Sequence, residues 1–182
     1  SETDMNEVRK MMGMVFQEGA LFDSMNVREN VAFALRRHTR MKEKEIRETV
    51  HERLEAVGLK DVEERTPNQL SGGMRRRVGI ARALALNPKI LLYDEPTTGL
   101  DPLLTATIVE LILKMRERYG STAVVVTHDI NAAIRISDRV AMLHEGKIIH
   151  KGSFKSLEKS DHPHIVKFLN SMRDTRNPQG GY

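Results

Sequence analysis

The sequence predicts an α/β fold with a mainly parallel sheet, and two observations lead to this prediction. Short apolar runs lie at Met11–Phe16, Ile90–Tyr93 and Ser121–Thr127, and segments with helical spacing of apolar residues separate them. The run Ile90–Tyr93 is flanked by prolines, which favours a short strand covered on both faces over a helix. Because strands and helices alternate, the strands are expected to pair in parallel through right-handed crossovers.

Composition excludes several classes of protein. The 182 residues suffice for one domain with a core, or for a core with a small lobe, and there is no cysteine for disulfides or thiolate metal sites. No apolar run approaches the roughly 18 residues that span a membrane. The net charge of +4 includes basic clusters at residues 36–44 and 75–77. A solvated surface explains these clusters better than contact with nucleic acid or anionic lipid.

The first part of the chain is expected to be largely helical. A strand ends at Gln17, a loop follows, and Asn26 can cap a helix over residues 27–38. A second helix is expected over residues 42–57, where apolar residues recur at spacings of three and four and Gly58 ends the pattern. This region contains no predicted strand, so it is a candidate lobe inserted into an α/β core.

The second half continues the alternation. Ser71 opens a helix that extends to about Leu86, and Pro102 suits the first turn of the helix after the central strand. His128 and Asp129 end the last apolar strand, and a helix is expected to about Ile136.

For the C-terminal part, the sequence predicts a hairpin, a helix and a tail. Residues 139–143 and 147–150 flank Glu145-Gly146, which is a two-residue hairpin signal. A short helix is expected at residues 164–172, and residues 173–182 are expected to be frayed or disordered.

Two adjacent carboxylates, Asp94 and Glu95, come directly after the central apolar strand. In open α/β sheets ligands bind beyond the carboxyl ends of strands, so a site for a metal and a phosphate is the natural use for such a pair. One acid would hold a cation and the other would activate water. The alternative is a charged pair that caps the strand at the surface.

The turn Ser71-Gly72-Gly73 opens a helix, so its hydroxyl and amide groups can face an anion with the helix dipole behind them. Glycine also lets the backbone approach an oxygen closely. Taken alone, these residues are better explained as a plain N-cap and turn.

Together the motifs resemble the nucleotide-binding subunit of ABC transporters. Gln17 resembles the Q-loop glutamine, the sequence LSGGM at residues 70–74 resembles the signature motif, and ILLYDE at residues 90–95 resembles Walker B with its catalytic glutamate. Residues 99–101 resemble the D-loop, and residues 127–129 resemble the switch-histidine loop.

The resemblance implies a P-loop NTPase fold with a RecA-like core and an inserted helical subdomain. The implied parts are a remnant of the core at residues 1–21, the helical subdomain at 22–78, the main core at 79–160 and a tail at 161–182. The core would have a parallel sheet that lacks its N-terminal part.

It also implies a role for each motif in the binding and hydrolysis of ATP with Mg²⁺. Asp94 and Gln17 would hold Mg²⁺, and Glu95 and His128, together with Gln17, would polarise and orient the attacking water. In a head-to-tail homodimer, Ser71, Gly72 and Gly73 would close over ATP held by the partner subunit, and Asp101 would lie at the interface.

One expected motif is not found. The 182 residues contain no G-x-x-x-x-G-K-[ST] loop, which family members carry before the Q-loop. We therefore expect the chain to be a fragment of a subunit without roughly its first third, so that the fragment retains the signature, Walker B and switch residues but not the main loop that holds the phosphates.

Within the family, GALFDSMNVRENVAFALRRHT at residues 19–39 and the methionine of LSGGM resemble the ATPases of Mla-type, Mce-linked phospholipid transport systems. This implies an integral membrane permease, a Mce-domain lipid-binding protein and a STAS-domain protein as partners, with no nucleic acid. The subunit would lie peripherally at the cytoplasmic face of the inner membrane. The alternatives are an amino-acid or methionine importer ATPase, a non-catalytic binding module, and an ABC ATPase of DNA repair or translation.

Overall fold

The structure is a computed structural model that describes residues 2–176. By its internal contacts the chain divides into two compact units, residues 1–132 and 133–182.

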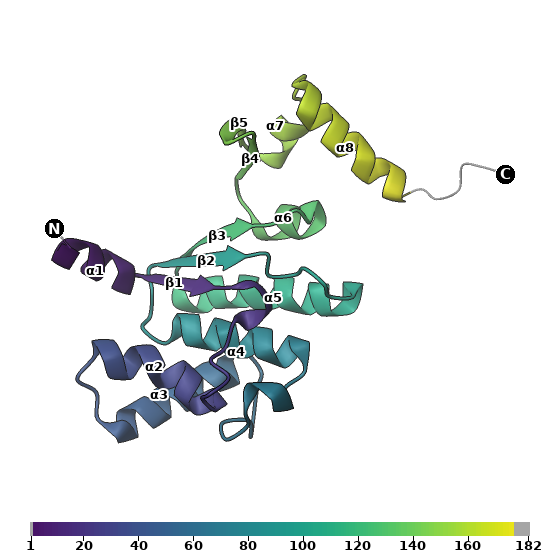
Figure 1. Cartoon of the computed structure of the whole chain (residues 1–182). Helices are drawn as coiled ribbons and strands as arrows, with labels where there is room; N and C mark the ends of the chain where they lie inside the picture. Colours follow the sequence, from purple (N-terminus) through teal and green to yellow (C-terminus); the bar gives the residue numbers. More distant parts are fainter. Residues whose placement is uncertain (1, 177–182) are drawn as a thin grey trace. The chain divides into compact units, whose positions relative to one another are not determined.

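The first unit is organised by a three-stranded parallel sheet (Figure 1). The strands β1 (Met12–Val15), β2 (Ile90–Asp94) and β3 (Thr122–Val126) lie in the order β1-β2-β3. In the ladder Gly13 is opposite Leu91, and Leu91 is opposite Ala123. The predicted α/β class and parallel pairing are therefore confirmed, and all three carboxyl ends lie at one edge of the sheet.

Helices occupy the connections between these strands. Those predicted from the sequence are confirmed within two residues at most ends, whereas the helix before β1 and the two short 3₁₀ helices were not predicted. The helical elements of this unit are α1 (Glu2–Lys10), η1 (Gln17–Gly19), α2 (Val27–His38), α3 (Glu43–Ala56), η2 (Pro67–Gln69), α4 (Gly72–Leu84) and α5 (Pro102–Tyr119).

Within the first unit, one face of the sheet is covered more fully than the other. Leu91 and Tyr93 of β2 are each 1% exposed, and α4 and α5 lie along one side of the sheet in Figure 1. Met14 of β1 and Val124 of β3, which are paired in register with Leu92, are 40% and 50% exposed. The prediction of a central strand covered on both faces is wrong within this unit, because Leu92 on the second face of β2 is only half-buried.

The helix α4 lies unusually close to the start of the sheet. A Cβ atom at Gly13 of β1 would lie 2.4 Å from the Ala83 carbonyl oxygen, and one at Gly79 would lie 2.8 Å from the Cα of Gly19. Arg82 strengthens this contact, because its guanidinium donates hydrogen bonds to the carbonyls of Gly19 and Ala20, each at 2.8 Å. Glycine at positions 13 and 79 thus permits α4 to contact β1 and η1 directly.

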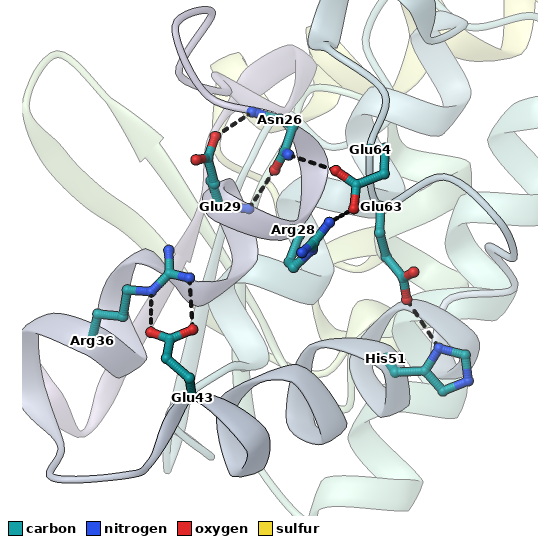
Figure 2. A network of polar contacts seen from close by, with 8 residues as sticks. All are labelled: Asn26, Arg28, Glu29, Arg36, Glu43, His51, Glu63 and Glu64. Carbon is teal, nitrogen blue, oxygen red and sulfur yellow. Dashed lines mark hydrogen bonds and ion pairs between the residues drawn. The ribbon is translucent and has the colours of Figure 1, made fainter.

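The start of α2 is fixed by a reciprocal capping box (Figure 2). The Asn26 side chain accepts a hydrogen bond from the Glu29 amide at 2.8 Å, and the Glu29 carboxylate accepts one from the Asn26 amide at 2.9 Å. Glu64 joins this cap through Asn26 and through an ion pair with Arg28. This confirms Asn26 as the predicted cap, which is a common device at helix starts.

Two further ion pairs tie α3 to its surroundings (Figure 2). Arg36 of α2 contacts Glu43 at the start of α3, with Nε to Oε1 at 2.9 Å. His51 of α3 lies 2.9 Å from Glu63, measured from Nδ1 to Oε1. The hydrogen bond with Glu63 raises the pKa of His51.

The C-terminal unit contains a hairpin and two helices, preceded by α6 (Ile130–Ile136), which crosses the division. The strands β4 (Val140–His144) and β5 (Lys147–Gly152) are antiparallel. Glu145 and Gly146 between them have φ values of 47° and 73°, as a type I′ turn requires, so the predicted hairpin is confirmed.

The end of the chain differs from the prediction in two ways. A short helix, α7 (Phe154–Glu158), was not predicted, and α8 (Pro163–Arg176) continues past the expected end at residue 172. Four residues of the predicted frayed tail are therefore helical, and residues 177–182 lie outside the described residues. Among residues 2–176, no helix is long and apolar enough to cross a membrane.

Candidate functional site

The carboxyl edge of the sheet brings Glu95 and His128 together. Glu95 follows β2 directly, and His128 follows β3 by two residues. His128 donates a backbone hydrogen bond to Glu95 Oε1 at 3.1 Å, and its ring Nδ1 lies 2.9 Å from the same oxygen. The ring donates this second bond whenever Nδ1 carries a proton. Two residues that are 33 positions apart thus form one polar pair.

The pair favours the charged form of both partners. Burial opposes ionisation of Glu95, but hydrogen bonds from His128 and Thr98 outweigh it and lower the pKa of the carboxyl group. The hydrogen bond and charge of Glu95 raise the pKa of His128. The Glu95 side chain is 23% exposed and that of His128 is 72% exposed, so the carboxylate is sheltered while the imidazole faces solvent.

The backbone of Glu95 departs from the geometry of the strand that precedes it. In an ideal strand Asp94 and Glu95 would point to opposite faces. Glu95 has a φ of 45°, which is uncommon for a residue other than glycine, and the strand pattern ends there. Such strain concentrates at functional sites, where surrounding contacts hold it in place. Here Thr98 supplies one such contact, because its hydroxyl donates to Glu95 Oε2 at 2.8 Å.

Asp94 and Gln17 lie at the same edge of the sheet. Asp94 is the last residue of β2, paired with Val126, and is half-buried. Gln17 begins η1 two residues after β1 ends, and its exposed side chain makes no hydrogen bond within residues 2–176. A carboxylate and an amide oxygen suit Mg²⁺, which keeps most of its water and takes few protein ligands. Among the described residues, no group of three or more His, Cys, Asp or Glu side chains is placed to hold a metal ion.

The start of α4 carries the second group of predicted residues. Ser71 is the N-cap of α4 and its hydroxyl accepts a hydrogen bond from the Met74 amide at 3.3 Å. A Cβ atom at Gly72 or Gly73 would meet nothing closer than 3.8 Å within the described structure. Unlike Gly79, these two glycines are not required by internal packing. An exposed helix start with bare backbone is suited to close approach by an external anion.

Asp101 is the N-cap of α5, and its carboxylate accepts hydrogen bonds from the amides of Leu103 and Leu104, each at 2.9 Å. The position of a Gly73 Cβ atom lies 3.8 Å from Leu104 Cδ2, so the starts of α4 and α5 are neighbours. Asp101 is therefore a capping residue in this chain, on the exposed surface beside the start of α4.

Three further residues of the site region were not identified from the sequence. They are Thr98, which binds Glu95; Arg76, whose guanidinium donates to the Thr98 carbonyl; and Asn30, which is fully buried. The Asn30 amide group donates to the carbonyls of Phe22, Met25 and Asn26, so it holds the loop that follows η1. A polar residue on the apolar side of the predicted α2 was the available signal for Asn30.

Comparisons with known proteins identify the family. Residues 1–98 match the family model described as ABC transporter. The whole chain is 41% identical to the intermembrane phospholipid transport system ATP-binding protein MlaF of Escherichia coli K12, and spans 69% of it. It is 44% identical, over 95% of its length, to the probable ribonucleotide transport ATP-binding protein mkl of Mycobacterium leprae, and spans 50% of that protein.

Solved structures agree with this assignment. A dimeric structure of the ATP-binding cassette MJ0796, in a post-hydrolysis state with ADP and Pi, superposes with a TM-score of 0.74 at 38% identity, covering 84% of this chain and 67% of that one. For cbiO1 of Clostridium perfringens, part of the ABC transporter complex cbiONQ, the TM-score is 0.79 at 31% identity, covering 98% and 69%. The chain belongs to the ABC transporter family, and the predicted P-loop NTPase fold is confirmed. It spans about half the length of its Mycobacterium relatives.

Proposed function

We propose that the chain belongs to the ATP-hydrolysing subunit of an ABC transporter that moves phospholipid between membranes. The observation that carries the proposal is the Glu95–His128 pair, which joins a sheltered carboxylate to a solvent-facing imidazole at the carboxyl edge of the sheet. A carboxylate held in this way can accept a proton from water, which is worth about 10²- to 10⁴-fold in rate. The imidazole can orient that water and donate to the γ-phosphate.

Asp94 and Gln17 are proposed to hold Mg²⁺ beside this pair. When bound, the metal neutralises charge on the phosphate oxygens. Asp94 would hold the metal largely through bound water, because Mg²⁺ loses its hydration shell reluctantly. Gln17 would also couple the site to residues 22–78, the proposed helical subdomain. It begins η1, and α4 contacts η1 through Gly79 and Arg82.

The second group of residues is proposed to act in a homodimer. Ser71, Gly72 and Gly73 would bind the phosphates of ATP held by the partner subunit, and Asp101 would lie at that interface. The support is the exposed start of α4 and the dimeric state of the related cassette MJ0796. Phosphate binding at helix N-termini needs only free amides and the helix dipole.

A permease is the proposed partner at the loop after η1. A groove of about 490 Å³ lies beside this loop and is lined by Ser24, Met25, Glu29, Phe33, Arg36 and Arg37. Phe33 is 44% exposed and contacts Phe22, with ring centroids 5.0 Å apart. Such a groove, apolar with a basic rim, suits an amphipathic helix of a membrane protein. The subunit would then lie at the cytoplasmic face of the inner membrane, with Mce-domain and STAS-domain proteins as further partners.

The test is reconstitution of the subunit with its permease in lipid nanodiscs, with ATP hydrolysis measured as phospholipid or ribonucleotide is added. The phospholipid assignment predicts stimulation by phospholipid, and Glu95→Gln should remove it. Stimulation by ribonucleotide alone would instead support the transport role for which the Mycobacterium relatives are named. If neither compound stimulates hydrolysis but basal hydrolysis is intact, the phospholipid assignment is contradicted and the ATPase assignment stands.

A further inference from the structure

Arg76 is a buried cation whose position the proposed mechanism does not explain. It lies in the second turn of α4 and is only 6% exposed. Its Nη2 donates to the Thr98 carbonyl, and its Nη1 lies 3.8 Å from the position of a Gly72 Cβ atom. Its Nε is buried and has no hydrogen-bond partner among the described residues.

This burial is unfavourable for stability alone. A guanidinium removed from water needs a carboxylate or several good hydrogen bonds to offset its lost hydration. Within residues 2–176 Arg76 forms no ion pair with a carboxylate, and one backbone carbonyl accepts from it. An apolar side chain of similar length would fill the same space without this cost. A role in the site is therefore the better explanation for an arginine here.

The neighbouring arginines of α4 have other contacts. Arg75 donates to the Leu70 carbonyl at 2.8 Å and also approaches Gly72, with its Nη2 3.9 Å from the position of a Gly72 Cβ atom. The Arg77 Nη1 lies 3.7 Å from the position of a Gly58 Cβ atom. Arg76 alone of these three reaches the segment after β2. Arg77 is thus a matched control, because it has the same chemistry one position along the helix and approaches a different part of the unit.

Thr98 connects Arg76 to the Glu95–His128 pair. Its carbonyl accepts from Arg76, while its hydroxyl donates to Glu95 Oε2 at 2.8 Å. The Thr98 amide also donates to the Glu95 carbonyl at 3.3 Å, which closes a turn over residues 95–98. Since Glu95 has a φ of 45°, this turn needs external support to keep its shape.

We propose that Arg76 is a positioning residue that couples the start of α4 to the Glu95 carboxylate through Thr98. An anion that draws the start of α4 toward itself would shift Arg76, and with it the turn that fixes Glu95 Oε2. The same guanidinium supplies positive charge behind Gly72, where the anion would lie. This inference rests on the proposed ATPase function, and it adds a route within one subunit from the signature motif to the water-activating acid.

The first test needs no activity and uses the 182-residue chain. The backbone amide signals of Glu95 and Thr98 are compared by two-dimensional NMR in the parent, Arg76→Met and Arg77→Met. Because Arg76 donates to the Thr98 carbonyl and Thr98 donates to Glu95 Oε2, loss of Arg76 should shift both signals, whereas Arg77→Met should leave them in place. Thr98→Ala should shift the Glu95 signal as well. Glu95 and Thr98 signals in Arg76→Met that are identical to those of the parent overturn the proposal.

The second test measures ATP hydrolysis in a version that carries a G-x-x-x-x-G-K-[ST] phosphate-binding segment fused ahead of Ser1. Arg76→Met should lower kcat about tenfold with KM changed less than about twofold, as expected for a residue that positions a reacting group. Arg76→Lys should recover part of the loss, and Arg77→Met should behave as the parent. The double variant Arg76→Met/Thr98→Ala should lose little more than either single one.

The two proposals fail in different ways. If the parent hydrolyses ATP and Glu95→Gln abolishes turnover, the ATPase function holds, and an unchanged kcat in Arg76→Met overturns the role of Arg76 alone. If the parent fusion binds ATP but Glu95→Gln hydrolyses it as fast, the proposed function itself is overturned. Melting curves identify any variant that has lost its fold, and Arg76→Lys then carries the test.

Discussion

Replacing Gly79 by alanine tests whether α4 and η1 depend on direct backbone contact. The new Cβ atom would lie 2.8 Å from the Cα of Gly19 and 3.2 Å from its carbonyl oxygen, and neither atom can rotate away. Gly19 has a φ of 87° and its carbonyl is held by Arg82, so η1 cannot move without losing that bond. Overpacking costs about 1 to 3 kcal/mol, and because both contacts are with backbone atoms we expect the upper half of this range, about 2 to 3 kcal/mol. Alanine's greater helix propensity returns about 1 kcal/mol, which leaves a net loss of about 1 to 2 kcal/mol.

The assay is urea unfolding of the 182-residue chain followed by far-UV circular dichroism. For a chain of this size the loss corresponds to a Tm lower by about 2 to 8 °C. Gly73→Ala in the same helix is the control, because its Cβ atom would be 3.8 Å from Leu104 Cδ2, an ordinary contact. We expect Gly73→Ala to be at least as stable as the parent, because alanine has the greater helix propensity. A Gly79→Ala variant as stable as the parent, or an equal loss in Gly73→Ala, would refute the close contact of α4 with η1.

Two other changes probe the helical segment. Asn30→Ala removes three hydrogen bonds to backbone carbonyls and should lower the free energy of unfolding by about 2 to 4 kcal/mol; a loss below about 0.5 kcal/mol in urea unfolding would contradict its role in holding the loop. His51 has a raised pKa because of its hydrogen bond with Glu63, so the stability it adds is complete below its unfolded pKa of 6.5 and is lost as pH rises through the raised value. His51→Gln should therefore flatten the pH dependence of the unfolding free energy above about pH 6, and an unaltered dependence would show that the pair contributes nothing.

Local signals in the sequence were sufficient for most of the fold. Asn26 as a cap, Gly58 after a helix and Glu145-Gly146 in a hairpin each depend on a few neighbouring residues, and all three predictions are confirmed. The cover of the sheet was predicted wrongly, because an apolar run such as β3 indicates burial but not which elements supply it. Val126 at its end is 60% exposed.

The sequence predicted the two paired residues of the candidate site, Glu95 and His128, but not the residues that hold them in place. The position of each motif after a strand placed Glu95 and His128 at one edge of the sheet, and the structure brings them into contact. Arg76 could not be recognised, because its partner Thr98 lies 22 positions away in the sequence. The same holds outside the site for Arg53, whose partner Tyr119 lies 66 positions away. Arg53 resembles any charged residue of an amphipathic helix, yet it is 4% exposed and donates to Asn87 at 2.7 Å. Such burial depends on tertiary packing, so a local sequence pattern cannot predict it.

The central claim is that Glu95, held by His128 and Thr98, activates water for attack on ATP. The most direct measurement is single-turnover hydrolysis by the fusion that carries the G-x-x-x-x-G-K-[ST] segment. The parent is compared with Glu95→Gln while ATP affinity is determined in the same samples. The account predicts that Glu95→Gln retains ATP binding and hydrolyses at least about 10²-fold more slowly. Hydrolysis within about twofold of the parent at equal ATP occupancy would contradict it.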